Sequence, residues 1–177
     1  MRERLIELIP EFNLIKNEEL REKTLRVFEK ALQKGGWKPD DLLRMPFTLL
    51  IQDCPANMVE HIRAVTRVAR ASSIELTAIF GERMPIDEDI LISGAILHDV
   101  GKLVEYEEKD GRFVTCKHGK MLRHPFSGVG LAYDEGLPDE VLHIIAVHAR
   151  EGDKARRIPA AFIVNHSDFM TFEPFHG

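Results

Sequence analysis

The sequence predicts an all-α protein of seven or eight helices and allows one small β-hairpin, and two observations support the helices. Apolar residues recur three or four positions apart through most of the 177 residues, which is the spacing of a helix face. Glycine and proline separate these periodic segments, as they do at helix ends. Apolar and polar residues alternate over 103–116, where Asp110-Gly111 indicates a small β-hairpin. The length corresponds to a single domain, 1–177.

Residues 1–54 are predicted to form an N-terminal helical extension. We expect one helix over 1–12, a second that Asn17 caps and Gly36 ends, and a short apolar segment over 39–46. The extension contains none of the eight histidines. We therefore interpret it as a packing element, a lid or a dimer surface rather than a source of chemistry, and a homo-oligomer stays open.

Residues 55–170 are predicted to form the core of the fold. We expect Pro55 to open a long helix that ends at Gly81. Asp87 should cap a very apolar helix that is ended by Gly101 and is buried on nearly all sides. Further helices are predicted over 121–133, from Pro138 and from Pro159.

Six side chains that can bind metal fall on or beside the apolar faces of five of these helices. Burying a carboxylate or an imidazole without a partner is costly, so such groups are usually paired or bound to a metal. A single histidine of this kind is also explained by hydrogen bonds in the core. One metal site, however, would explain all six residues together: His61, His98, Asp99, His124, His148 and Asp168.

The types of ligand narrow the choice of metal. A mixed set of imidazoles and carboxylates without cysteine argues against a closed structural zinc site. It favours iron or manganese, with cobalt, nickel, zinc or magnesium still open. His124 and His148 could hold a second ion about 3.5–4 Å from the first, with Asp99 as the bridge. We therefore expect one or two divalent ions. Asn165, one turn before Asp168, is a candidate partner of this site.

The ordered set His61, His98-Asp99 and Asp168, followed after the dipeptide by Gly101-Lys102, resembles the signature of the HD-domain superfamily. The resemblance covers about residues 55–170. Members of this superfamily are mostly metal-dependent phosphohydrolases with an all-α fold. His124 and His148 resemble the extra histidines of its binuclear branch. The resemblance implies an HD-domain helical bundle around a metal site.

The sequence departs from the motifs of several branches of this superfamily, and these departures argue against their activities. Val100-Gly101 stands where hydrolases of hyperphosphorylated guanine nucleotides have Glu-Asp. No Gly-Tyr-Pro occurs, which argues against cyclic-dinucleotide phosphodiesterases. No RNA-binding module accompanies the domain, which argues against a ribonuclease. The ligand set resembles that of the dinucleoside-tetraphosphate hydrolases. It equally resembles a branch of di-iron oxygenases related in fold to inositol oxygenase.

These observations predict a metal-dependent phosphohydrolase that cleaves a phosphoester or phosphoanhydride of a nucleotide or another small molecule by metal-activated hydroxide. Asp99 and Lys102 are the candidate catalytic residues. Lys102, Arg123 and Arg150 are candidates for binding substrate phosphate, although each also fits a solvated surface charge. The alternatives are a di-iron oxygenase on a small polar substrate and a non-catalytic metal-binding regulatory domain. The intact ligand set argues against the second alternative.

Composition restricts the partners and the compartment. The net charge is -5 and no long basic run occurs, so stable nucleic-acid binding is not expected. No apolar stretch reaches about 18 residues, so no membrane span is expected. Cys54 and Cys116 form no paired motif, which favours reduced cysteines in a cytoplasmic protein. The expected partner is a small phosphorylated substrate.

The remaining histidines are expected to lie outside the site: His118, His143, His166 and His176.

Overall fold

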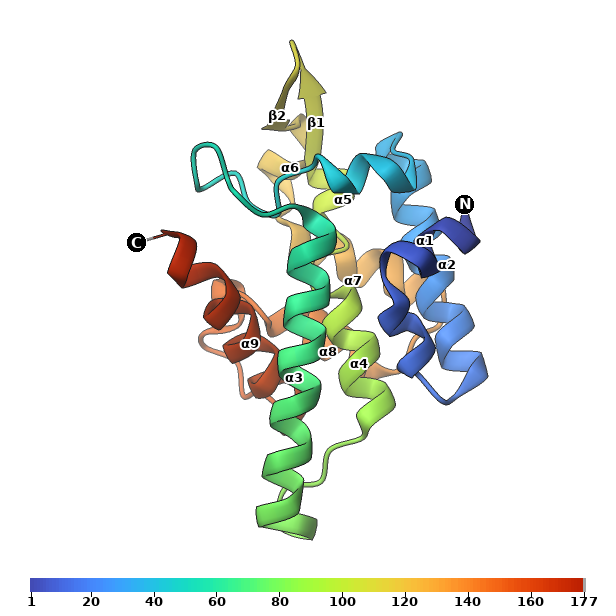
Figure 1. The fold of residues 1–177 in the computed structure, drawn as a ribbon, viewed down its shortest axis with the longest axis vertical. Coiled ribbons are helices and arrows are strands. Elements are labelled where there is room, and N and C mark those ends of the chain that lie inside the picture. Colours follow the sequence, from blue (N-terminus) through green and yellow to red (C-terminus); the bar gives the residue numbers. More distant parts are fainter. Residues whose placement is uncertain (177) are drawn as a thin grey trace.

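The computed structural model describes residues 1–176 and has an all-α architecture with one small hairpin, so the predicted fold class is confirmed (Figure 1). Two of its nine α-helices, α5 and α6, are only four and five residues long and were not anticipated. The helices are α1 Arg2–Leu8, α2 Glu18–Gly35, α3 Met58–Phe80, α4 Glu88–Leu97, α5 Lys102–Glu105, α6 Lys117–Met121, α7 His124–Asp134, α8 Asp139–Val147 and α9 Pro159–His176, and the strands are β1 Tyr106–Lys109 and β2 Arg112–Thr115.

The long helix α3 and the apolar helix α4 lie side by side at the centre of the molecule (Figure 1). Helix α9 packs against α3 on one side, while α1 and α2 lie on the other side of the α3–α4 pair. Helices α7 and α8 pack against each other, and α8 also packs against α4. The hairpin projects from the end of the molecule where α3 begins (Figure 1). Within residues 1–176, no helix has the length and apolarity to cross a bilayer.

Helix α4 is buried along most of its length because other helices surround it. Every residue from Leu91 to Leu97 is buried. Gly94 allows α8 to approach closely, since a Cβ at this position would lie 2.6 Å from the Cδ1 atom of Ile144. The chain therefore leaves α4 deep inside the protein, and the two residues that follow, His98 and Asp99, are buried as well.

The N-terminal segment shares the hydrophobic core with the rest of the chain. Phe12 and Phe28 pack edge to face and join the same buried cluster as Ile96 of α4. The indole nitrogen of Trp37 donates a hydrogen bond to the carbonyl oxygen of Leu103 at 2.8 Å. The first 54 residues thus bury apolar surface together with the helices that carry the predicted site.

Several predicted helix ends are confirmed, and the start of α3 is corrected. The side chain of Asn17 accepts a hydrogen bond from the backbone of α2, and Asp87 does the same for α4. Gly36 ends α2 in the left-handed conformation, with φ of 76°. Helix α3, however, begins after Asn57 rather than at Pro55, because Asn57 and Glu60 cap each other's backbone N–H groups.

Gly101 was predicted to end the helix that carries His98, and this prediction was wrong. Its φ is -64°, so it does not adopt the left-handed conformation of a helix stop, and α5 begins immediately after it. Glycine is required here because a Cβ would collide with the carbonyl oxygen of His124. Gly101 thus allows the turn after Asp99 to touch the start of α7.

The helix predicted over 121–133 is divided in the structure. Met121 belongs to α6, and its side chain is exposed rather than packed in the core. Helix α7 starts at His124, after Arg123 in an extended conformation. Pro125 explains the break, because a proline lacks an N–H and fits only the first turn of a helix. Pro138 similarly lies just before α8 rather than at its first position.

The hairpin predicted within 103–116 is present but shorter. Strands β1 and β2 pair in antiparallel register from Tyr106 opposite Thr115 to Lys109 opposite Arg112. Asp110 and Gly111 both have positive φ, as a type I′ turn requires. The residues before Tyr106 form α5 instead of extending the first strand.

Two glycine substitutions test the close approach at Gly101. We expect Gly101→Ala to destabilise the protein by roughly 1–3 kcal/mol, because the added methyl group overpacks the contact with α7. Gly130→Ala is the matched control, since nothing lies within 4 Å of its added Cβ and alanine favours a helix by roughly 0.5–1 kcal/mol. Urea unfolding measures both changes, and equal effects would contradict the proposed contact.

Candidate metal centre

Four histidine rings, two on helices and two on residues that directly follow helices, meet at the buried end of α4. The Nε2 atoms of His61 and His98 lie 3.2 Å apart, and those of His124 and His148 lie 3.3 Å apart. His61 comes from α3 and His98 directly follows α4. His124 begins α7 and His148 directly follows α8. All four rings are buried.

Asp99 lies between the two histidine pairs and faces each pair with a different oxygen. Its Oδ2 is 3.3 Å from the Nε2 atoms of both His61 and His98. Its Oδ1 is 3.3 Å from the Nε2 of His124 and 3.6 Å from that of His148. Only 1% of the residue is exposed. We call the side of Oδ2 the first half-site and the side of Oδ1 the second half-site.

The far nitrogen of each histidine ring has a hydrogen-bond acceptor. The Nδ1 atoms of His98 and His148 lie 2.6 Å and 2.8 Å from the carbonyl oxygens of Ala95 and Ile145, three residues earlier. A carbonyl oxygen only accepts, so each Nδ1 carries the proton and each Nε2 presents a lone pair. The corresponding partners of the other two rings are the hydroxyl of Thr171, which contacts His61, and the carboxylate of Glu105, which contacts His124.

Asp168 adds a second carboxylate to the first half-site. Its Oδ1 is 3.2 Å from the Nε2 of His61 and 3.9 Å from that of His98. Asn165, one turn earlier on α9, donates a hydrogen bond to the carbonyl oxygen of His148 at 2.5 Å. It therefore anchors the turn after α8 to α9. Helix α9 thus contributes a carboxylate on one side and fixes a histidine on the other.

The converging atoms fit a divalent metal ion at each half-site. Two nitrogens bound to one ion at about 2.1 Å lie roughly 3.0–3.4 Å apart, depending on the coordination angle. The two observed Nε2 separations fall in this range. In each of the groups His61–His98–Asp99 and Asp99–His124–His148, the potential ligand atoms lie within 4.8 Å of one another. Lone pairs and negative charge facing one another in a buried space favour the binding of a cation.

The electrostatics of the two carboxylates favour their ionised forms. Burial raises the pKa of Asp168, but the hydrogen bond with His61 outweighs burial and lowers it to about 2. For Asp99 burial also raises the pKa, and the positive charge of Lys102 outweighs it and holds the pKa well below its usual range. Both groups are therefore negatively charged at neutral pH and available to bind a cation.

The pKa values of His61 in the first half-site and His124 in the second shift in opposite directions. Burial lowers the pKa of His61, but hydrogen bonds with Asp168 and Asp99 outweigh burial and the net pKa is raised. Burial lowers the pKa of His124 below its usual value, despite the neighbouring carboxylate of Glu105. The carboxylates thus draw positive charge to the first half-site, while His124 stays neutral, which is the form that binds metal.

Lys102 lies against the site but does not point freely into solvent. Its Nζ donates hydrogen bonds to Asp99 Oδ2 at 2.6 Å and to the carbonyl oxygen of Phe47 at 2.7 Å. Burial lowers the pKa of Lys102, but the negative charge of Asp99 outweighs burial and raises it above the usual value. Lys102 is therefore a permanent positive charge at the edge of Asp99, rather than a solvated lysine.

A cavity of about 420 Å³ opens onto the site and collects the other predicted residues. Arg123 and Arg150 lie on its wall, together with Asp99 and Asp168. Arg123 contacts Glu105 at 3.5 Å and Glu151 at 3.2 Å, and Arg150 is exposed at the rim. Aromatic side chains cover much of the remaining wall: Phe47, Tyr106, Phe169 and Phe172.

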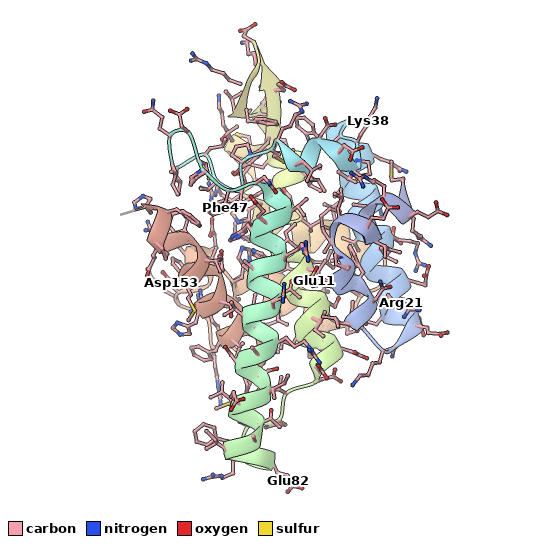
Figure 2. The ribbon with its side chains drawn as sticks, in the orientation of Figure 1. Glu11, Arg21, Lys38, Phe47, Glu82 and Asp153 are labelled. Carbon is pink, nitrogen blue, oxygen red and sulfur yellow. The ribbon has the colours of Figure 1, made fainter. Side chains whose placement is uncertain are left out.

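Three residues at the site were not anticipated from the sequence. The ring of Phe47 stacks on His61 with the centroids 4.3 Å apart, near the N-terminal end of α3 (Figure 2). Thr171 and Glu105 hold the far nitrogens of His61 and His124. Thr171 lies one turn after Asp168 on α9, and this spacing is the only sequence signal that could have identified one of them.

The other histidines lie outside the cluster. The ring of His118 contacts the hydroxyl of Ser127 at 2.9 Å, and the ring of His143 accepts a hydrogen bond from the backbone of Ile158. His166 is exposed on α9. These placements agree with the interpretation of these residues as surface or supporting side chains.

A buried histidine–carboxylate cluster beneath a cavity in an all-α bundle is a candidate centre for metal-dependent catalysis. Comparison with known proteins agrees, because the HD domain family matches residues 58–170. The chain belongs to the HD domain family, and it is a metal-dependent phosphohydrolase, as the resemblance of its motifs implied.

Two relatives place the chain more closely. It is 30% identical over 184 residues to dihydroneopterin 2′,3′-cyclic phosphate phosphodiesterase of Methanocaldococcus jannaschii, covering 94% of this chain and 67% of the relative. It is 31% identical over 115 residues to ribonuclease Y of Desulforudis audaxviator, covering 65% of this chain but only 18% of that relative. No solved structure gave a significant match. Similarity to a phosphodiesterase favours the hydrolase over the oxygenase and the regulatory alternatives.

The metal-binding role of Asp99 and His98 can be tested directly. We expect His98→Ala or Asp99→Ala to weaken metal binding by at least about 100-fold while circular dichroism remains helical, because direct ligands are lost. His166→Ala is the control, since this exposed histidine lies outside the cluster. Elemental analysis after gel filtration measures the metal content, and a full content in either ligand variant would contradict the assignment.

The second half-site predicts a change in stoichiometry. We expect the wild-type protein to bind two ions per chain and His124→Ala to bind one, because the first half-site keeps its own ligands. Isothermal titration with Mn²⁺ of metal-free protein measures both numbers. If both proteins bind one ion, His124 and His148 are core or substrate-contacting histidines instead.

Proposed function

We propose that this chain hydrolyses the cyclic phosphodiester of a small heterocyclic compound, with divalent ions held by His61, His98, Asp99, His124, His148 and Asp168. The observation that carries the proposal is the position of Asp99, whose two oxygens face separate histidine pairs at the floor of the cavity. Asp99 would contribute one oxygen to each half-site if both hold an ion. Iron or manganese suits the mixed nitrogen and oxygen ligands.

The ions would supply the electrophilic part of the chemistry: they lower the pKa of water toward neutrality and neutralise charge on the phosphate oxygens. The protein supplies charge of its own. Lys102 keeps Asp99 ionised, and its place on the cavity wall would let its positive charge contribute to phosphate binding. Its raised pKa makes it a poor proton donor, so we assign it an electrostatic role. Arg150, exposed at the rim, is available to attract the anionic substrate.

Arg123 is the remaining candidate for phosphate binding. It is held by Glu105 and Glu151 at the cavity wall, so its positive charge is partly compensated before substrate binds. We propose that it guides the phosphate toward the second half-site and that Arg150 provides the uncompensated charge. The carboxylates around it also limit the cavity to substrates of low negative charge, such as a phosphodiester, in preference to a polyphosphate.

The aromatic wall supports a heterocyclic substrate. Phe169 and Phe172 of α9 and Phe47 of the N-terminal segment line the same cavity as the predicted ligands. Such rings stack on planar heterocycles regardless of their hydrogen-bonding edges. The substrate that names the archaeal relative, a pterin carrying a 2′,3′-cyclic phosphate, combines a planar ring with a phosphodiester of one negative charge. A compound of this kind would place its phosphodiester beside Asp99 and Asp168 and its planar ring against the aromatic wall.

The cysteines and the cavity bear on the cellular location of the chain and on its partners. Cys54 and Cys116 are both free, which supports the reducing environment of the cytoplasm. The cavity has the volume of a small-molecule site, so we propose a small phosphorylated substrate and no stable complex with nucleic acid. We keep residues 55–170 as the catalytic core and 1–54 as an extension that completes its cavity through Phe47. A homo-oligomer is compatible with this organisation.

The reaction class can be tested under anaerobic conditions. We expect Mn²⁺-loaded protein to open ribonucleoside and pterin 2′,3′-cyclic phosphates, and to release nitrophenol from bis-p-nitrophenyl phosphate, in the strict absence of oxygen. Lys102→Ala should lower the rate by about 100-fold or more, since a charge that stabilises the transition state is removed. Phosphate-ester products are quantified by chromatography. Silence across the panel, with oxygen consumption by Fe²⁺-loaded protein on a small substrate, would identify an oxygenase.

A further inference from the structure

We propose that Glu105 is a positioning residue: it fixes the ring of His124 and thereby sets the metal affinity of the second half-site. The proposal rests on the metal-binding role of His124 given above. Glu105 is the last residue of α5 and lies in no recognised motif. The residue is 3% exposed, yet its carboxylate contacts neither Asp99 nor a ring nitrogen that faces the half-sites.

The carboxylate of Glu105 holds His124 at two points. Its Oε2 accepts a hydrogen bond from the backbone N–H of His124 at 2.6 Å and one from the Nδ1–H of the ring at 3.2 Å. The first bond fixes the backbone at the start of α7, and the second fixes the rotation of the ring. With Nδ1 engaged in this way, the Nε2 lone pair is directed at Asp99 Oδ1.

Glu105 is itself held in place by its surroundings. Its carbonyl oxygen accepts a hydrogen bond from the backbone N–H of Cys116 at 2.9 Å. Gly119 of α6 lies so close that a Cβ there would collide with the Cγ atom of Glu105. Arg123 lies 3.5 Å from the second oxygen, Oε1. The stem therefore has little freedom to rotate, and the carboxylate can act as a rigid support.

The four histidine rings differ in the acceptor that their far nitrogen contacts. His98 and His148 donate to backbone carbonyl oxygens, and His61 contacts the hydroxyl of Thr171. Only His124, among the rings of the two half-sites, has a carboxylate behind it. A charged acceptor makes a stronger hydrogen bond than a neutral one and increases the basicity of the opposite nitrogen. We infer that the second half-site depends on Glu105 and that the first does not.

The matched experiment compares Glu105→Gln with Thr171→Val by titration of metal-free protein with Mn²⁺. Glu105→Gln should weaken the binding of the second ion about 10- to 100-fold and leave the first unchanged, as expected when the partner of a metal-binding histidine is lost. Thr171→Val removes the corresponding partner of His61 and should weaken the first ion instead. In the His124→Ala background, Glu105→Gln should cause no further change, because it acts through the missing ring.

A separate measurement distinguishes this role from simple stabilisation of the fold. Mn²⁺ electron paramagnetic resonance should change from the spectrum of a coupled pair to that of a single ion in Glu105→Gln, while a loss of fold stability would not alter one ion selectively. Glu105→Asp, which keeps the charge but shortens the side chain, replaces the amide variant if that one does not fold. If neither variant folds, Glu105 serves the fold and the proposal is overturned.

The outcomes also separate this proposal from the proposed function. A wild-type protein that binds two ions, together with an unchanged Glu105→Gln or equal weakening of both ions, contradicts the role of Glu105 alone. A wild-type protein that binds one ion, lost in His98→Ala but kept in His124→Ala, contradicts the second half-site and the positioning role with it. Two ions in the wild type with selective loss of the second support both.

Discussion

The buried carboxylate of Asp99 is the constraint on which the rest of the structure depends. Two histidine pairs face its two oxygens, and one ring of each pair, His98 and His148, presents a lone pair because its other nitrogen donates to a carbonyl oxygen. Such an arrangement is electrostatically unfavourable in a protein interior unless positive charge lies among these atoms. Lys102 supplies part of this charge from one side. The remaining side chains converge closely enough to form a candidate cation site, and the surrounding helices keep them close together.

Two of the four histidine rings are positioned by the same local hydrogen bond. His98 and His148 each follow the last residue of a buried helix and bond back to the carbonyl oxygen three residues earlier. That bond satisfies a carbonyl group that the helix end would leave unpaired, and it also sets the tautomer of the ring. Helix termination and ligand orientation are thus the same interaction at both positions. The packing of α4 against α8 then brings the two termini together.

The sequence allowed prediction of the fold class and of the residues that cluster around Asp99. Polar side chains on an apolar helix face interrupt its periodicity, so His61, His148 and Asp168 are conspicuous against their neighbours. Residues that support the site leave no such trace. Glu105 lies between Val104 and Tyr106 in a segment whose alternation predicted a strand, where it would have faced solvent. Its importance depends on tertiary contacts with α6 and α7, which local periodicity does not encode.

Phe47 extends the site beyond the region shared with the family. Its ring covers His61 and its carbonyl oxygen receives Lys102, yet it precedes the matched region, which begins at residue 58. Divergence among relatives in the loop before α3 could therefore alter how the lysine is oriented, and how much room a ligand has, while every residue of the shared motif stays the same. Enzymes with identical signatures could in this way come to prefer different substrates, and the reason would lie in a stretch that alignment of the shared domain leaves out.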